Sequence, residues 1–184
     1  MKDQEIQRAA KKQDAARVYN AGLNLLARRE HSSKELKQKL GRRFADALVD
    51  EACARLEHNG LLSDERFTEA VIHSRTAKGY GPRHIAQELA QKGVAKEVIK
   101  EFLDERDAHW VGHARDAALK KLRTTSRLAE AFRDLQNDTA SAEEVREHQQ
   151  QMTLARQKLS AFLGRRGFSS EMVCAALATE FSSS

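Results

Sequence analysis

Apolar residues recur along the chain three or four positions apart, which is helical spacing, rather than in alternation. Leu36 and Leu40 are separated by four residues, and so are Ile85 and Leu89. Such a pair places both side chains on one face of a helix. The 184 residues include one proline, nine glycines and 5 % aromatic residues. The pattern therefore predicts an all-α protein and disfavours a β-sandwich or a β-barrel.

The helical pattern also repeats along the chain. When the sequence is compared with itself at a shift of 49 residues, Leu36 and Leu40 align with Ile85 and Leu89. At a further shift of 74 residues, Ile85 aligns with Leu159. The second shift also aligns residues 92–94 with residues 166–168, so that glycine meets glycine. This periodicity predicts three related units.

Each unit is predicted to contain three helices joined by short turns. Ser32-Ser33 forms a helix N-cap, Pro82 suits the first position of the corresponding helix, and Asn59-Gly60 and Gly93 end helices. Units of this size are marginal alone and gain stability by stacking. We therefore expect three tandem three-helix repeats in an elongated curved array. The predicted domains are a flexible segment 1–12, which is a frayed helix start or a disordered tail, repeat one at 13–62, repeat two at 63–105 and repeat three at 106–184.

Several single residues carry expectations about packing. Cys53 and Cys174 lie in apolar helical patterns, which predicts small buried thiols rather than a disulfide or a metal site. Phe67 is expected in the core, and Asp64 is expected to cap or precede the first helix of repeat two. Tyr80 either packs within its glycine-rich turn or contacts a partner.

The net charge of +5 is unevenly distributed. Residues 28–43 contain seven Lys/Arg against two Glu, and residues 106–127 contain six against two Asp. The stretch near 127–150 is acidic, and we interpret it as an insertion in repeat three, with a loop at 137–141 and a helical extension at 143–151. The two basic stretches face a polyanion or are ordinary solvated helix faces, and charge alone leaves both possibilities open.

Little in the sequence points to catalysis. The glycines at 79 and 81 lack the Gly-Lys-Ser/Thr of a phosphate-binding loop, and His109 and His113 have no evident third ligand. We therefore expect no enzyme activity, no metal and no cofactor. The absence of an apolar stretch of roughly 20 residues and of an export signal predicts a cytoplasmic protein with no membrane contact, which we expect to be monomeric.

Four segments together resemble the RecX family. The central match is GLLSDERF at 60–67, Arg75, and GYGPRHIAQELAQKGV at 79–94. LLARREHSSKEL at 25–36 and FLGRRGF at 162–168 are similar to flanking family segments. The resemblance covers roughly residues 20–122 and 152–181, and the acidic insertion departs from it.

The resemblance implies a fold of three tandem three-helix repeats and a function as a negative regulator of RecA. Family members lie in the deep groove of the RecA–single-stranded DNA filament and lower its ATP hydrolysis, strand exchange and co-protease activity. They thereby modulate recombinational repair and the SOS response. Some members also bind DNA directly, so the alternative is a helical DNA-binding protein that acts independently of RecA.

Basic residues at positions that match the family are the candidates for contact with RecA or DNA. They are Arg28, Arg29, Lys34, Arg75, Lys78, Arg83, Arg165 and Arg166. Three further candidates rest on charge alone: Lys120, Lys121 and Arg123.

Overall fold

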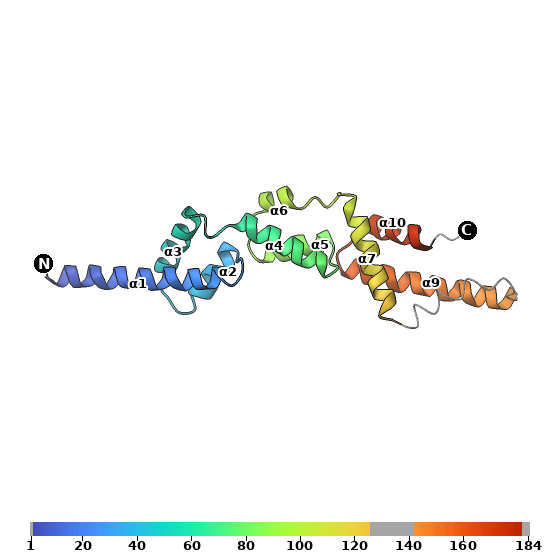
Figure 1. Cartoon of the computed structure of the whole chain (residues 1–184), viewed down its shortest axis with the longest axis horizontal. Helices are drawn as coiled ribbons and strands as arrows, with labels where there is room; N and C mark the ends of the chain where they lie inside the picture. Colours follow the sequence, from blue (N-terminus) through green and yellow to red (C-terminus); the bar gives the residue numbers. More distant parts are fainter. Residues whose placement is uncertain (1, 126–141, 182–184) are drawn as a thin grey trace. The chain divides into compact units, whose positions relative to one another are not determined.

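The computed structural model describes residues 2–125 and 142–181, which form nine α-helices and no strand (Figure 1). The all-α prediction is therefore confirmed for the described residues. The helices are α1 (Lys2–Leu26), α2 (Ser33–Leu40), α3 (Asp46–His58), α4 (Asp64–Ala77), α5 (Pro82–Gln91), α6 (Lys96–Phe102), α7 (His109–Arg123), α9 (Ala142–Arg165) and α10 (Ser170–Phe181). Within these ranges, no helix has the length and apolar character that crossing a membrane requires.

The helix starts follow from local capping. The Ser32 hydroxyl accepts a hydrogen bond from the Glu35 amide at 3.1 Å, which caps α2 as predicted. Helix α5 begins at Pro82, where a missing amide hydrogen has no cost. Ser63, not Asp64, caps α4, because the Ser63 hydroxyl accepts from the Arg66 amide at 3.1 Å.

Two predicted segments concern the ends of helices. Helix α1 begins at Lys2, and the flexible character expected of segment 1–12 stays a prediction. The predicted loop at 137–141 lies outside the described residues. Helix α9 begins at Ala142, which confirms the helical extension at 143–151.

The aligned positions of the three repeats have the same structural role. The apolar pairs of the second helices are all at most 2 % exposed: Leu36, Leu40, Ile85, Leu89, Leu159 and Leu163. The aligned glycines Gly93 and Gly167 have positive φ angles of 84° and 90°. The repetition seen in the sequence therefore corresponds to repeated packing and repeated backbone turns.

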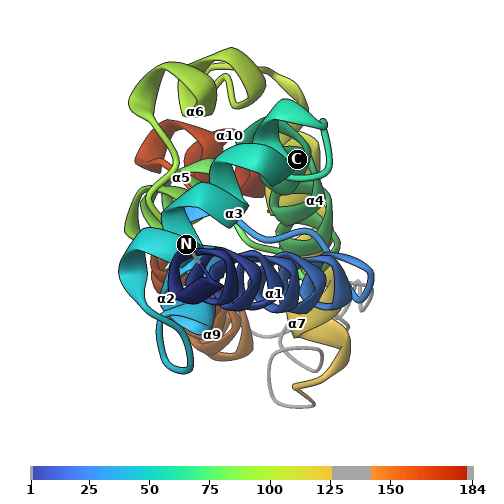
Figure 2. The ribbon, with the colours of Figure 1, turned by 90° about the vertical axis from the view of Figure 1, so that its left-hand side faces the viewer.

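The chain divides into two compact units, and the division falls within repeat two. Unit one comprises Met1–His73 and Ala86–Leu103, and unit two comprises Ser74–Ile85 and Asp104–Ser184. In unit one, α1, α2 and α3 pack against one another around a core that includes Leu36 (Figure 2). In unit two, α10 packs against α7 and α9. The repeat boundaries drawn from the sequence remain predictions.

Apart from Asp64, the packing expectations are confirmed with one exception. Cys53 and Phe67 are buried, and Tyr80 packs within its turn against His84 at 4.3 Å between ring centroids. The prediction of a buried thiol at Cys174 is wrong, because this residue is exposed. On α10 the buried face is formed by Met172, Val173, Ala176 and Leu177, and Cys174 points away from it.

Candidate functional site

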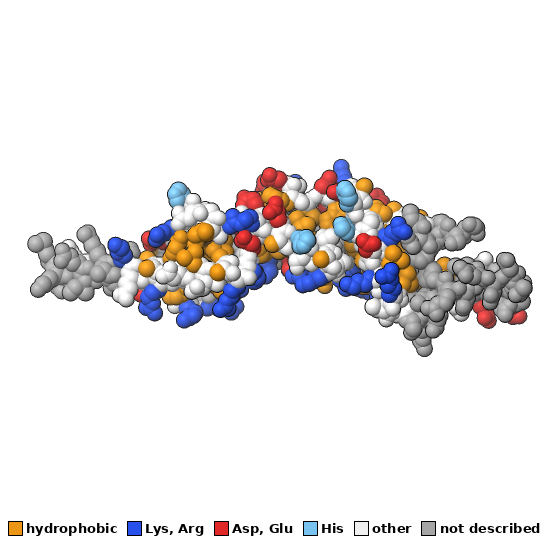
Figure 3. Space-filling model, in the orientation of Figure 1, with side chains coloured by type: hydrophobic (Ala, Val, Ile, Leu, Met, Phe, Trp, Pro, Cys, Tyr) orange, Lys and Arg blue, Asp and Glu red, His pale blue; other side chains and the backbone are white. Residues whose placement is uncertain are grey.

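The basic candidate residues are divided between the two units. Arg28, Arg29 and Lys34 belong to unit one, and the other eight candidates belong to unit two. Lys and Arg side chains of unit one gather along one edge, over α1 and α2 (Figure 3). Each group is described within its own unit.

In unit one, Arg29 is committed to an ion pair with Glu35. Its guanidinium donates to both carboxylate oxygens of Glu35, Nη2 to Oε1 at 2.6 Å and Nη1 to Oε2 at 3.1 Å. Lys39 Nζ and Lys92 Nζ lie 3.5 and 3.7 Å from the same Oε1. The Arg29 hydrogen bonds hold the pKa of the Glu35 carboxyl at about 2, although burial opposes this shift. Arg29 is therefore held within the protein by this ion pair, although both Arg29 and Arg28 beside it are exposed.

His31 completes this cluster in its neutral form. Lys39 Nζ lies 3.0 Å from His31 Nε2, and an ammonium group can only donate, so Nε2 is the acceptor. The proton is then on Nδ1, which donates to the Arg29 carbonyl at 2.9 Å. Burial lowers the pKa of His31, which favours this neutral state.

The start of α2 contacts the turn that follows α5, and this contact forms a first joint between successive repeats. The Ser32 hydroxyl donates to the Lys92 carbonyl at 2.7 Å. Lys34 Nζ donates to the Gln91 carbonyl at 3.3 Å, and the Lys34 side chain covers Gly93, where an added Cβ would lie 2.5 Å from Lys34 Cδ. Lys34 thus packs its aliphatic stem on the joint while the residue as a whole stays exposed.

Unit two contains the equivalent joint between the start of α5 and the turn after α9. The Gly81 amide donates to the Arg166 carbonyl at 2.7 Å, and the Arg83 amide donates to the Gly167 carbonyl at 3.1 Å. A Cβ at Gly81 would lie 2.7 Å from backbone atoms of Gly167, so only glycine allows this approach. The same kind of contact therefore recurs at aligned positions.

The Arg166 side chain also makes contacts at the second joint. Its Nη1 donates to the Lys78 carbonyl at 2.7 Å, and its guanidinium carbon lies 4.4 Å from the ring centroid of Tyr80. It also lies 5.1 Å from the ring centroid of Phe162. Like Arg29, Arg166 is engaged within its own unit. It is therefore a poorer candidate for contact with a partner than its neighbour Arg165, which is exposed.

The remaining candidates of unit two differ in their exposure. Arg75 is half-buried and has an interaction within the protein. Lys121 is half-buried beside Phe162, with Nζ 5.8 Å from the ring centroid. The exposed residues are Lys78, Arg83, Lys120, Arg123 and Arg165. These five side chains form the accessible positive charge of unit two among the candidates.

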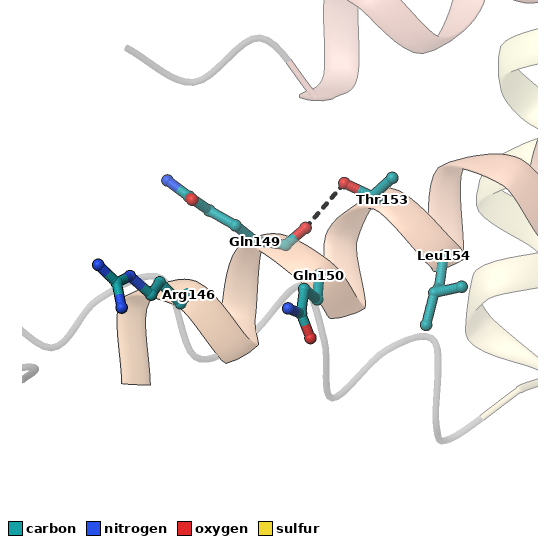
Figure 4. A pocket seen from close by; sticks show the side chains of 5 residues that line it. All are labelled: Arg146, Gln149, Gln150, Thr153 and Leu154. Carbon is teal, nitrogen blue, oxygen red and sulfur yellow. Dashed lines mark hydrogen bonds between the residues drawn. The ribbon is translucent and has the colours of Figure 1, made fainter. Parts of the chain in front are cut away.

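A hollow on α9 is formed by a single helix. It is lined by Arg146, Gln149, Gln150, Thr153 and Leu154, which all come from this one helix (Figure 4). The Thr153 hydroxyl donates to the Gln149 carbonyl of its own helix at 2.8 Å. Residues 2–125 and 142–181 also contain no cluster of three or more His, Cys, Asp or Glu side chains that could hold a metal ion.

Sequence reasoning missed the groups that neutralise Glu35 and the role of Asp64. The i, i+4 spacing of Glu35 and Lys39 is a signal for one of these contacts. Lys92 lies far away in the sequence and gives no such signal. Asp64 accepts from the Ser33 amide at 2.8 Å, so it joins the starts of α2 and α4.

Comparison with known proteins gives similarities over both sequence and fold. Residues 19–56 match a family model described as RecX, first three-helix domain, and residues 63–103 match RecX, second three-helix domain. The regulatory protein RecX of Halorhodospira halophila is 48 % identical over 99 residues, which cover 53 % of this chain and 62 % of that protein. The regulatory protein RecX of Pseudomonas entomophila is 34 % identical over 157 residues, which cover 85 % of this chain and 86 % of that protein.

Two solved structures share the fold. The crystal structure of RecX from Lactobacillus salivarius superposes with a TM-score of 0.68 at 19 % identity, covering 91 % of this chain and 97 % of that one. A crystal structure of regulatory protein RecX gives a TM-score of 0.66 at 20 % identity, covering 91 % of this chain and 74 % of that one. At these identities the likeness concerns the fold.

Proposed function

Because this chain belongs to the RecX family of regulatory proteins, we propose that it binds the RecA–DNA filament in its groove and inhibits it. In this proposal the bound protein lowers ATP hydrolysis, strand exchange and co-protease activity by RecA. It thereby moderates recombinational repair and the SOS response in the cytoplasm. The protein acts by binding and not by catalysis.

One observation carries the proposal: exposed cations stand at aligned positions beside both joints. Lys34 and Arg83 each occupy the second residue of a second helix, and both are exposed. Exposed Lys and Arg side chains suit phosphates or an acidic protein surface. Each unit has its own exposed cations, so one chain can make two weak contacts with the filament. Two contacts made by the same chain give tighter overall binding than either contact alone.

The test is a titration of DNA-dependent ATP hydrolysis by RecA with the purified protein. We expect hydrolysis to slow at protein amounts well below that of RecA. An unchanged rate at equimolar protein would end the proposal.

A charge-reversal pair tests the contact surface. Arg83→Glu with Arg165→Glu should weaken the inhibition, because both side chains are exposed cations of unit two. Arg166 is left intact, because its contacts with Lys78 and Tyr80 belong to the fold. Lys96→Glu with Lys100→Glu on α6 is the matched control, with the same change in net charge at exposed positions. Equal inhibition by the two double variants would show that the basic surface of unit two is not used.

Direct binding to DNA without RecA is the second candidate, and it is favoured by Lys120, Lys121 and Arg123 at the end of α7. It predicts binding to naked DNA that weakens steeply with salt, because cations on phosphates release counterions. Binding that is absent, or insensitive to salt, would argue against it.

A further inference from the structure

A pocket of about 310 Å³ lies in unit two, between the end of α7 and the C-terminal half of α9. It adjoins the second joint, because Arg166 of that joint contacts the ring of Phe162 in the pocket lining. Its lining residues are Lys121, Thr125, Lys158, Leu159, Ala161, Phe162 and Arg165. All seven are described residues of unit two.

The floor of the pocket is apolar and contains an aromatic ring. Leu159 is fully buried, and Phe162 is half-buried above it. Arg166 lies 5.1 Å from the Phe162 ring centroid and is itself hydrogen-bonded to the Lys78 carbonyl, so it supports the ring from outside the pocket lining. Lys121 Nζ also lies over this ring at 5.8 Å, so the ring offers a stacking surface for a flat ligand when the Lys121 side chain turns aside.

The rim of the pocket is strongly positive. Lys158, Phe162 and Arg165 lie four and three residues apart on α9, which places both cations on the same helix face as the ring. Lys121 comes from α7, with its Nζ 5.8 Å from the ring centroid. None of the seven lining residues is acidic, so the three positive charges have no carboxylate within the lining.

Together the floor and the rim fit a ligand that has a flat aromatic part and several negative charges. One nucleotide within a DNA strand brings a single phosphate charge, whereas three cations surround this one ring. A nucleoside diphosphate or triphosphate has the matching charge. The volume is at the lower end of the range for small-molecule sites, about 300–1,000 Å³, so the base would fill the pocket and the phosphates would lie on the rim.

We propose that this pocket of unit two binds a free nucleoside diphosphate or triphosphate, with the base on Phe162 and the phosphates on Lys121, Lys158 and Arg165. The Thr125 hydroxyl stands at the edge of the pocket, where it can hydrogen-bond to the ribose. The pocket shares Arg165 with the basic surface proposed to contact RecA, so nucleotide binding is tested in the absence of RecA.

The probe is a fluorescent etheno-derivative of ADP, and its anisotropy is measured with the full chain in the absence of RecA. We expect saturable binding. Phe162→Leu keeps the apolar volume and removes the stacking surface, so it should weaken binding roughly 5- to 150-fold, which corresponds to the loss of about 1–3 kcal/mol of base stacking. Lys158→Gln should weaken binding roughly 10- to 150-fold, since a hydrogen bond to a charged group contributes roughly 1.5–3 kcal/mol.

Lys100→Gln on α6 is the matched control, because it removes one exposed lysine charge far along the chain from the lining residues, and it should leave binding unchanged. Circular dichroism and the melting temperature show that each variant is folded. Inorganic tripolyphosphate should compete less well than ADP, because it lacks the base.

Four results would overturn the proposal. They are no saturable binding at millimolar probe, equal competition by tripolyphosphate and ADP, much tighter binding of an oligothymidylate than of ADP, and displacement of the probe by an acidic peptide at lower concentration than by ADP. Because RecA is absent from the assay, failure here leaves the RecA titration unaffected, and the reverse is also true.

Discussion

Replacing Gly167 by alanine tests whether the joint in unit two holds that unit together. Gly167 has a φ of +90°, a backbone conformation that costs a residue with a side chain about 1–3 kcal/mol. An added Cβ would also lie 2.4 Å from the His84 amide nitrogen and 2.6 Å from His84 Cβ. The His84 backbone must then move away, because a main-chain nitrogen cannot rotate aside as a flexible side chain can.

That movement stretches two hydrogen bonds, from the Gly81 amide to the Arg166 carbonyl at 2.7 Å and from the Arg83 amide to the Gly167 carbonyl at 3.1 Å. Each bond contributes about 1 kcal/mol net. With the backbone strain, Gly167→Ala should lower the free energy of unfolding by about 3–5 kcal/mol. Urea denaturation followed by circular dichroism measures this loss.

Two other glycines are matched controls. Gly60 has a φ of +66° and no atom within 4 Å of an added Cβ, so Gly60→Ala should cost only the backbone strain of about 1–2 kcal/mol. Gly164 lies within α9 with the same open space, and Gly164→Ala should stabilise the protein by about 0.5–1 kcal/mol.

Amide hydrogen exchange gives the local readout. The Gly81 amide should be protected in the parent protein and exchange faster in Gly167→Ala, because its acceptor carbonyl belongs to the adjacent Arg166. The reasoning is refuted if Gly167→Ala destabilises the protein no more than Gly60→Ala and the Gly81 amide remains protected.

Three further predictions concern single buried or exposed groups. The Glu35 carboxyl has a pKa of about 2 in the folded protein and an ordinary value of 4.5, so it should contribute on the order of 3 kcal/mol to the free energy of unfolding. This contribution should be complete above about pH 4.5 and should be lost as the pH falls towards 2. Urea denaturation at a series of pH values should show no such decline in Glu35→Gln. Leu89 is 0 % exposed, so Leu89→Ala should lower the free energy of unfolding by about 2–5 kcal/mol in the same assay. Leu154 is 54 % exposed, so Leu154→Ala should change it by no more than about 0.5 kcal/mol. Equal losses would contradict the core assignment. Cys174 is exposed and should react rapidly with a thiol reagent in the native protein. Cys53 is buried and its pKa is raised to about 11, so it should react only after unfolding. Mass spectrometry measures the two rates of modification, and equal rates in the native protein would disprove this prediction.

Features that depend on near neighbours in the sequence could be predicted from the sequence. The apolar pair of α2 at Leu36 and Leu40, the cap at Ser32 and the start of α5 at Pro82 all follow from interactions within one helical turn. The repetition of the pattern predicted equivalent positions in the repeats, and the paired positive φ angles of Gly93 and Gly167 confirm this equivalence. The resemblance to the RecX family rested on the same local runs of residues.

The state of the basic candidates could not be predicted in this way. Arg166 and Arg165 are neighbours of the same residue type, yet Arg166 binds the carbonyl of Lys78, 88 residues away, while Arg165 is exposed. Arg29 pairs with Glu35, which is only six residues away, and both Arg28 and Arg29 are exposed. For Arg166, whether the cation is free for a partner depends on an acceptor that only tertiary packing brings close.

Amphipathic spacing likewise left the exposed face of α10 undetermined. Cys174 lies between apolar residues in the sequence, but α7 and α9 pack against the other side of the helix and leave it in solvent. The division into two compact units within repeat two also comes from packing, because each joint brings together atoms of successive repeats. Thus the sequence by itself determined the helices, their order and the family, since these depend on neighbours along the chain. The tertiary structure decided that Arg166 is engaged within the protein and which turns contact each other, because those contacts join residues 60 to 88 positions apart.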